Sequence, residues 1–370
     1  MKDTFFETIY HSSKWLKDLL QSLLGISAEF VSDLLIYKGK LLFPTRKELK
    51  NMKQPEKELS KICGITFAPF APAGSFRQEN AKQSLKMMKE RTSANFVIFV
   101  PGGLQETPQS EKISYTSDRT MTDDELKAMI EYAHSLGLRV AIKPTVNCAN
   151  GTWRAHINFF DEDVPCEPKW RNWFSSYMEF QNHYAGIAQE TGCEMHIAGC
   201  EMVMSERREK EWRQTIAEIR KEFGGLVSYN TDKYQEHNVK WWDCVDVISS
   251  SGYYPIDDWE RQLDRIEAVV TKFRKPFFFA EAGCMSVAGS KYVPNDWSVR
   301  GESDLEGQKD WYSAMFSACR KRSWVGGFAL WSWTDRLYSE AETERRKDYE
   351  LYAKPAERIV QENYNALNFS

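Results

Sequence analysis

Short apolar segments alternate with longer amphipathic ones from residue 62 to near the end of the chain. The short segments are rich in β-branched and aromatic residues, which predicts strands. There are eight of them: ICGITF (62–67), ANFVIFV (94–100), LRVAIK (138–143), EMHIAGC (194–200), GLVSYN (225–230), CVDVISSSG (244–252), PFFFAEA (276–282) and GGFALWSW (326–333). The segments between them, such as TDDELKAMIEYAHSLG, have helical periodicity.

Eight strand–helix units predict an α/β protein whose parallel strands close into a (β/α)₈ TIM barrel. The alternative is an open doubly wound sheet, which would normally carry a Gly-rich phosphate turn that this sequence lacks. Two helix starts are predicted, one from Thr122 with Glu125 as a capping box and one at Ser205. Gly137 and Gly224 are the predicted stops of these helices.

Residues 1–60 have a different pattern from the rest of the chain. Apolar residues fall on one helical face, and a charged stretch, TRKELKNMKQPEKELSK, follows. The pattern predicts an N-terminal helical extension over residues 1–60 and a separate barrel domain over residues 61–370. The extension is either docked on the main domain, a contact through which a homo-oligomer forms, or an interfacial helix on a membrane.

Composition narrows the class of protein. Of the 370 residues, 42% are hydrophobic and 28% charged, which is typical of a globular protein, and the net charge of -4 argues against a nucleic-acid partner. No apolar run reaches the ~18 residues of a membrane span, and charges at Lys14, Lys17 and Asp18 interrupt the candidate signal segment. The eight cysteines include no C-x-x-C pair, so reduced thiols and a cytoplasmic location are expected.

Two apolar strands end in a glutamate. Glu201 follows IAGC and Glu281 follows FFFA, at the ends of the fourth and seventh predicted strands. In a barrel the carboxyl ends of the strands meet at one face, so these two carboxylates are expected to share a pocket. Most glycoside hydrolases use a pair of carboxyl side chains for catalysis. The alternative is that each is a buried partner of a Lys or Arg.

Polar and aromatic residues at the other strand ends are candidates for substrate binding. One of Tyr253 and Tyr254 is expected to donate a hydrogen bond to a catalytic carboxylate. Trp331 is a candidate floor for a sugar ring, and Trp333 shares its face if side chains alternate, although core packing explains Trp333 better. The remaining candidates are Lys143, Asn147, Trp153, Asn230 and Asp335.

No metal or cofactor is predicted. The six histidines fall at positions 11, 134, 156, 183, 196 and 237, and no two show ligand spacing. His196 is out of phase with Glu201 and should point towards the helices as a core residue.

The chain resembles the retaining β-glycosidases that carry an acid/base glutamate on strand four and a nucleophile on strand seven, and among them glycoside hydrolase family 113, the β-mannanase family. The resemblance covers roughly residues 60–365 and rests on GITFAPF, VAIKPTVN, GCEM, SGYYP, FFFAEAG and ALWSWTD. It implies Glu201 as acid/base, Glu281 as nucleophile and β-1,4-linked mannose as substrate. Many of those enzymes have Asn before the acid/base glutamate, where this chain has Cys200, so the sugar identity stays open.

These observations together predict a cytoplasmic retaining β-glycosidase that acts on short manno-oligosaccharides, by hydrolysis or by transfer to another sugar. One alternative is a β-glycosidase for glucose or xylose. Another is a sugar-binding barrel without turnover, against which the presence of both glutamates counts.

Overall fold

The computed structural model describes residues 59–368, and the predicted extension up to residue 58 lies outside them. Eight parallel strands close into a barrel in the order β1-β2-β4-β6-β7-β8-β9-β10, with β10 pairing back to β1. The strands are β1 (Ile62–Phe67), β2 (Phe96–Phe99), β4 (Arg139–Ile142), β6 (Met195–Cys200), β7 (Leu226–Thr231), β8 (Val247–Ser251), β9 (Phe277–Glu281) and β10 (Val325–Trp333). All eight predicted strands are present, and the barrel is confirmed over the open sheet.

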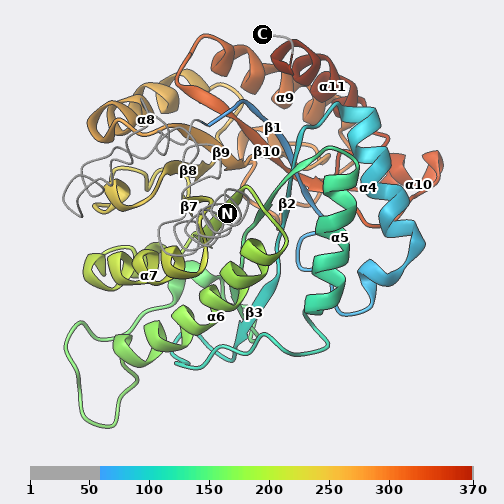
Figure 1. Cartoon of the computed structure of the whole chain (residues 1–370). Helices are drawn as coiled ribbons and strands as arrows, with labels where there is room; N and C mark the ends of the chain where they lie inside the picture. The colour runs from blue at the N-terminus through green and yellow to red at the C-terminus, as the bar shows by residue number, and fades with distance from the viewer. Residues whose placement is uncertain (1–58, 369–370) are drawn as a thin grey trace, which may run out of the picture. The chain divides into compact units, whose positions relative to one another are not determined.

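Helices surround the barrel strands (Figure 1). They are α4 (Glu79–Thr92), α5 (Asp123–Ser135), α6 (Trp170–Glu190), α7 (Glu209–Glu222), α8 (Trp259–Phe273), α9 (Leu305–Arg320), α10 (Glu340–Arg345) and α11 (Pro355–Asn368). One connection departs from the expected alternation, because the segment between β7 and β8 contains a 3₁₀ turn, Trp242–Cys244, in place of an α-helix. No helix in residues 59–368 is long and apolar enough to cross a membrane.

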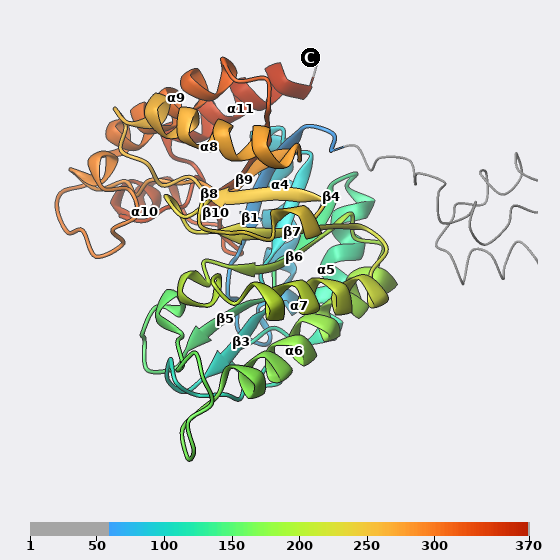
Figure 2. The same ribbon diagram turned by 90° about the vertical axis from the view of Figure 1, so that its left-hand side faces the viewer.

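A small second sheet was not predicted. It pairs β3 (Gly102–Gln105) in parallel with β5 (Thr145–Cys148), and Figure 2 shows it in the lower part of the molecule, near α6. Each strand follows a barrel strand, so the sheet extends the barrel at its carboxyl-end face. Neither GGLQ nor TVNC has the long β-branched run by which strands are recognised.

Strand alternation divides the apolar residues into two layers. Side chains such as Ile62, Phe96, Ile98 and Phe278 fill the barrel interior, while their neighbours pack between strands and helices in a larger cluster. Leu59, just before β1, packs against the interior cluster. The barrel interior is therefore filled with side chains, so a binding site can form only at the strand ends and loops.

One predicted helix start is confirmed and the other is wrong. Thr122 and Glu125 form the complete capping box of α5, and Gly137 follows this helix with a φ of 74°. Ser205 instead ends a 3₁₀ turn, Val203–Ser205, where its hydroxyl donates to the carbonyl of Met202 at 2.8 Å, and α7 starts only at Glu209. Contacts of the next residue, Glu206, with β7 hold this segment against the barrel.

Candidate active site

The turn at the end of β6 places Glu201. Gly199 has a φ of 142°, and a Cβ there would meet the Tyr177 hydroxyl at 2.3 Å, so only glycine fits. The pairing of β6 with β7 shifts register between Ile197 and Cys200. Glu201 then adopts a left-handed φ of 53°, and its N–H donates to the carbonyl of Asn230 at 2.8 Å.

Glu281 is the last residue of β9, and the barrel brings it to Glu201 as expected. A carboxylate oxygen of Glu201, one of Glu281 and the Cys200 sulfur all lie within 4.8 Å of one another. Glu201 is 7% exposed and Glu281 4% exposed. Two carboxyl groups this close in a buried pocket need partners, and each has its own set.

Three donors surround the Glu281 carboxylate. Lys143 forms an ion pair with Oε1, the Cys200 thiol donates to the same oxygen at 3.2 Å, and the Tyr253 hydroxyl donates to Oε2 at 2.8 Å. Burial alone would raise the pKa of Glu281, but Lys143, with Arg154 and the Cys200 thiol, brings this pKa below its usual value. Glu281 is therefore held as a carboxylate.

Glu201 has a different set of neighbours. The Ser251 hydroxyl donates to Oε1 at 2.8 Å, the Trp153 indole N–H donates to Oε2 at 3.3 Å, and an Arg154 nitrogen lies 3.6 Å from Oε2. Arg154 is buried and its Nε has no protein partner. Burial acts against the charge of the guanidinium, but the neighbouring carboxylates Glu201 and Glu281 raise its pKa above the usual value.

A buried hydrogen-bond chain connects the two glutamates. Lys143 Nζ, which pairs with Glu281, also donates to Asn230 Oδ1 at 3.3 Å. Asn230 Nδ2 donates to Ser251 Oγ at 3.0 Å, and that hydroxyl donates to Glu201. Lys143 and Asn230 have no exposed surface. Both are candidates for substrate contact; in the structure Lys143 pairs with Glu281, while the Asn230 side chain bonds Lys143, Ser251 and the carbonyl of Thr231.

A third carboxylate lies near Glu201. Asp232, which follows β7, is 6% exposed and pairs with Lys233 at 3.3 Å. Burial, and then repulsion by Glu201, raises the pKa of Asp232 to about 7, although Lys233 acts in the opposite direction.

Two tryptophans offer ring surfaces at the pocket. Trp331 is half-buried, with Lys143 Nζ 5.6 Å from its ring centre and the Phe70 ring at 6.0 Å. Trp153 is 40% exposed and packs edge-on against His156 at 5.9 Å. Both were predicted as substrate contacts, and both lie beside the groups that surround the glutamates.

Two aromatic residues at the strand ends point away from the glutamates. The Tyr254 hydroxyl is buried and donates to Glu236 at 2.7 Å, because successive residues at the strand end point to opposite sides. Trp333 does not share the face of Trp331: it is fully buried and donates to Ser84 of α4 at 3.1 Å. The pairing of β10 with β1 shifts register here, which breaks the alternation, and the Trp331–Ser332 peptide bond is cis.

Asn147 and Asp335 lie in segments that follow barrel strands at the carboxyl-end face. Asn147 is half-buried in β5, and Asp335 lines a separate hollow with residues 73–75. His196 faces α6, where Nε2 hydrogen-bonds to Gln181 Oε1 at 2.9 Å, and burial lowers its pKa to about 3. The expectation of a core histidine is therefore confirmed.

Within residues 59–368, one group of three possible metal ligands lies close together: Cys200, Glu201 and Glu281. The group does not suit a divalent cation, because Lys143 already neutralises Glu281. Burial, followed by the charge of Glu281, raises the pKa of the Cys200 thiol well above its usual value, so the thiolate that a metal requires is disfavoured.

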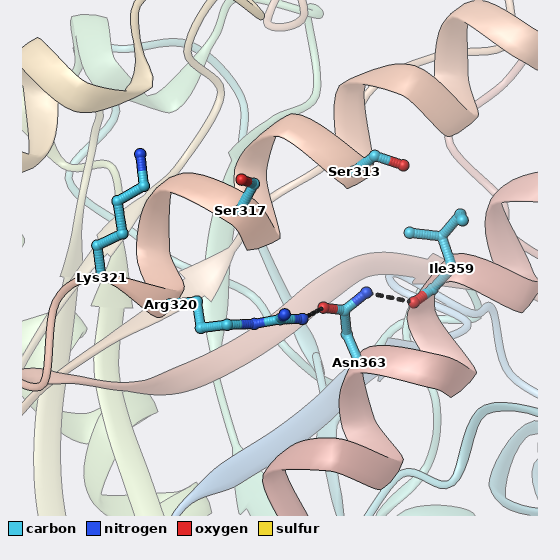
Figure 3. Close-up of a pocket in the computed structure, with 6 residues that line it drawn as sticks. All are labelled: Ser313, Ser317, Arg320, Lys321, Ile359 and Asn363. Carbon is cyan, nitrogen blue, oxygen red and sulfur yellow. Dashed lines mark hydrogen bonds between the residues drawn. The ribbon is translucent and has the colours of Figure 1, made fainter.

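A hollow on the outside of the barrel is unrelated to this site. It has a volume of about 360 Å³ and lies between α9 and α11 (Figure 3). Its side chains bond one another: Arg320 donates to Asn363 Oδ1 at 2.7 Å, and Asn363 donates to the carbonyl of Ile359 at 2.8 Å (Figure 3). None of its lining residues surrounds the glutamates.

Comparison with known proteins gives a consistent set of relatives. The model of glycoside hydrolase family 113 matches residues 65–354. A solved glycoside hydrolase family 113 β-1,4-mannanase is 55% identical with a TM-score of 0.82, over 83% of this chain and 99% of its own. The family 113 β-mannanase AaManA from Alicyclobacillus acidocaldarius, in complex with ManMIm, is 40% identical with a TM-score of 0.81, over 85% and 100%.

More distant structures share the fold alone. A β-D-glucuronidase from Dictyoglomus thermophilum is 16% identical with a TM-score of 0.56, over 83% of this chain and 50% of its own. None of the curated proteins compared matches the chain.

Proposed function

The chain belongs to glycoside hydrolase family 113, and we propose that it cleaves β-1,4-mannan fragments with retention of configuration, using Glu281 as nucleophile and Glu201 as acid/base. The observation that carries the proposal is the pair itself: two buried carboxylates with oxygens within 4.8 Å of each other. Retaining enzymes hold their carboxyl groups ~5–5.5 Å apart, whereas inverting enzymes need ~6.5–9.5 Å to admit a water.

In the first step the Glu281 carboxylate attacks the anomeric carbon and the glycosidic bond breaks. The leaving oxygen takes the proton of Glu201. Glu281 suits the nucleophile's part because Lys143, Cys200 and Tyr253 all stabilise its ionised form.

In the second step Glu201, now a carboxylate, accepts a proton from a water molecule or from a hydroxyl of an acceptor sugar. The deprotonated oxygen attacks the anomeric carbon, the ester bond to Glu281 breaks, and Glu281 leaves as a carboxylate. Ser251 suits both states of Glu201, because a hydroxyl can donate to a carboxylate or accept from a carboxylic acid.

The substrate class rests on the relatives, which are β-mannanases at 40–55% identity. Trp331 and Trp153 provide the flat apolar faces against which sugar rings pack. The eight free cysteines fit a reducing cytoplasm, where short manno-oligosaccharides are the accessible form of the polymer. A panel of mannose, glucose and xylose oligosaccharides separates this reading from a β-glycosidase for another sugar.

Nucleophile and acid/base are distinguished by substitution. Glu281→Gln, which keeps a polar partner for Lys143, should abolish turnover of every substrate, because no glycosyl–enzyme ester can form. Glu201→Ala should still form the ester from an aryl mannoside with a good leaving group, and azide should restore turnover with a β-mannosyl azide product. Melting midpoints of both variants provide the folding control. Equal losses on activated and natural substrates, without azide rescue of Glu201→Ala, would refute the assignment.

A further inference from the structure

A second hollow lies at the carboxyl-end face of the barrel, between the loops that follow β9 and β10. It has a volume of about 540 Å³, which is in the ~300–1,000 Å³ range of small-molecule sites. Its lining includes Met285, Val287, Trp297, Arg300, Lys347 and Tyr349. It contains neither glutamate.

Tyr349 joins this hollow to the active site. Its ring centre is 5.9 Å from that of Tyr253, whose hydroxyl donates to Glu281. Gly283 lies between Tyr349 and the Trp331 backbone. A Cβ added to Gly283 would lie 2.4 Å from the carbonyl oxygen of Trp331 and 3.2 Å from the Tyr349 ring. Tyr349 is therefore next to Tyr253, the partner of the nucleophile, and close to the backbone of Trp331 and Ser332, while it also forms a wall of the hollow.

The hollow presents an aromatic ring on an ordered loop. Trp297 is 72% exposed. Its loop is held by the Tyr349 hydroxyl, which donates to the carbonyl of Pro294 at 2.6 Å, and by Ser298, whose N–H donates to Asp296 Oδ1 at 2.9 Å. These bonds hold the backbone on either side of Trp297, and an exposed indole offers a flat apolar face to a partner.

Polar donors lie beside this ring. Lys347 Nζ donates to the carbonyl of Gly301 at 2.6 Å, and Arg300 Nη1 donates to the carbonyls of Trp297 and Val299 at 3.2 and 3.1 Å. Both cations are exposed and have further N–H donors beyond these contacts. An aromatic face with hydroxyl-binding donors around it fits a neutral sugar ring.

We propose that this hollow, centred on Trp297, is a subsite for a mannosyl residue beyond the two sugars that flank the cleaved bond. The inference rests on the proposed function, since it takes the same chain of sugars further along the surface. Its consequence is a preference for longer oligosaccharides, because only these reach from the glutamates past Tyr349 to Trp297.

The test compares Trp297→Ala with Tyr292→Ala. Tyr292 is an aromatic of the same loop, 55% exposed, that does not line the hollow. For Trp297→Ala we expect KM for mannohexaose to rise about three- to tenfold, the loss typical of one aromatic contact, with a much smaller rise for mannotriose. Tyr292→Ala should keep the wild-type ratio of the two KM values. An equal rise on both substrates, or the same ratio in both variants, overturns the proposal.

A binding measurement separates this inference from the proposed function. Calorimetry with mannohexaose on Glu281→Gln, with and without Trp297→Ala, requires no turnover. Weaker binding without Trp297 supports the subsite even if the wild-type enzyme cleaves no mannan fragment, in which case the proposed function alone fails. Identical binding with and without Trp297, or no binding of mannohexaose, overturns the subsite.

Discussion

Glu281 and Glu201 are buried close together, but the groups that contact their carboxyl oxygens differ in charge. Glu281 pairs directly with a lysine ammonium, whereas Glu201 accepts hydrogen bonds from a serine and an indole, with Arg154 farther off at 3.6 Å. A direct cation favours one charge state, and a hydroxyl tolerates both. These contacts support the proposed division between a nucleophile held as a carboxylate and an acid/base that changes its charge.

Lys143→Met should move the acid limb of the pH profile. Burial raises the pKa of Glu281 and Lys143 is the largest influence that lowers it, so without Lys143 this pKa should rise. We expect the lower apparent pKa of kcat/KM to increase by about one unit or more. Lys240→Met, at an exposed lysine that bonds only a loop carbonyl, is the matched control. If the acid limb stays in place, Lys143 does not set the charge of Glu281.

Trp331→Ala should reduce activity more than stability. Trp331 is half-buried and lies over Lys143, whereas its neighbour Trp333 is fully buried and bonded to α4. We expect kcat/KM for mannotriose to fall at least tenfold while Trp331→Ala stays well short of the ~3–5 kcal/mol that deletion of a buried tryptophan costs. Trp333→Ala provides that comparison. A Trp331→Ala protein that loses stability as Trp333→Ala does but keeps normal activity when folded would place Trp331 in the core.

At this scale the sequence predicted the residues on strands better than those on loops. The Tyr253 hydrogen bond follows from strand ends meeting in one pocket, and Lys143, predicted as a substrate contact, ends in the same pocket as the partner of Glu281. Arg154 was missed because it lies in a loop, and loop direction cannot be read from a pattern. Ser251 was missed because all three serines of VISSS are buried, so burial does not single out the one that faces Glu201.

Irregular strand ends account for the errors at the scale of elements. Both β6 and β10 shift register near their carboxyl ends, where they carry Glu201 and Trp331. A strict two-residue alternation predicts the middle of each strand correctly, and it fails where a bulge re-aims the chain. Most barrel strands were predictable because they contain runs of apolar, β-branched or aromatic residues, while β3 and β5 are four residues each and had no such pattern.

Glu206, in the segment between β6 and α7, should make the free energy of unfolding depend on pH. Tyr229 and Thr231 of β7 donate to Oε1 at 2.8 and 2.7 Å, and Oε2 has no protein partner. Burial raises the pKa of Glu206 to about 8 despite these bonds. The folded protein therefore holds this proton more tightly than the unfolded chain, so the stabilising effect of protonation is complete at low pH and lost as the pH rises towards 8.

Urea unfolding at several pH values tests this contribution. We expect the free energy of unfolding to decrease between pH ~4.5 and ~8, with Glu206 contributing at most about 1.4 kcal/mol per pH unit. Glu206→Gln should flatten the dependence, whereas Glu222→Gln, at an exposed residue of α7, should leave it as in the wild type. A Glu206→Gln protein with the wild-type slope would show that Glu206 is not the group that titrates.

The barrel and the candidate site at its carboxyl-end face lie in one part of the chain. All eight strands, the interior cluster and both glutamates lie within residues 59–368. The solved β-mannanases align over 99–100% of their own lengths while covering 83–85% of this chain. The solved chains therefore correspond to a part of this protein, and the family match over residues 65–354 contains the candidate site.

Removal of residues 1–58 should leave an active enzyme, and the position of the cut should matter. Leu59 packs on the barrel interior, and Lys61 donates to the carbonyl of Val325 at 3.2 Å, so a chain that starts at Leu59 keeps contacts that a chain starting at Ile62 loses. We expect the Leu59 form to hydrolyse mannotriose within about twofold of the full chain, and the Ile62 form to melt at a lower temperature.

Sedimentation of the full chain and the Leu59 form then tests the predicted oligomer contact: a dimer that becomes a monomer assigns the contact to residues 1–58, and an unchanged mass assigns it elsewhere or excludes it. An inactive but folded Leu59 form would mean that the first 58 residues contribute to catalysis, against the expectation from relatives that align over their entire length without them.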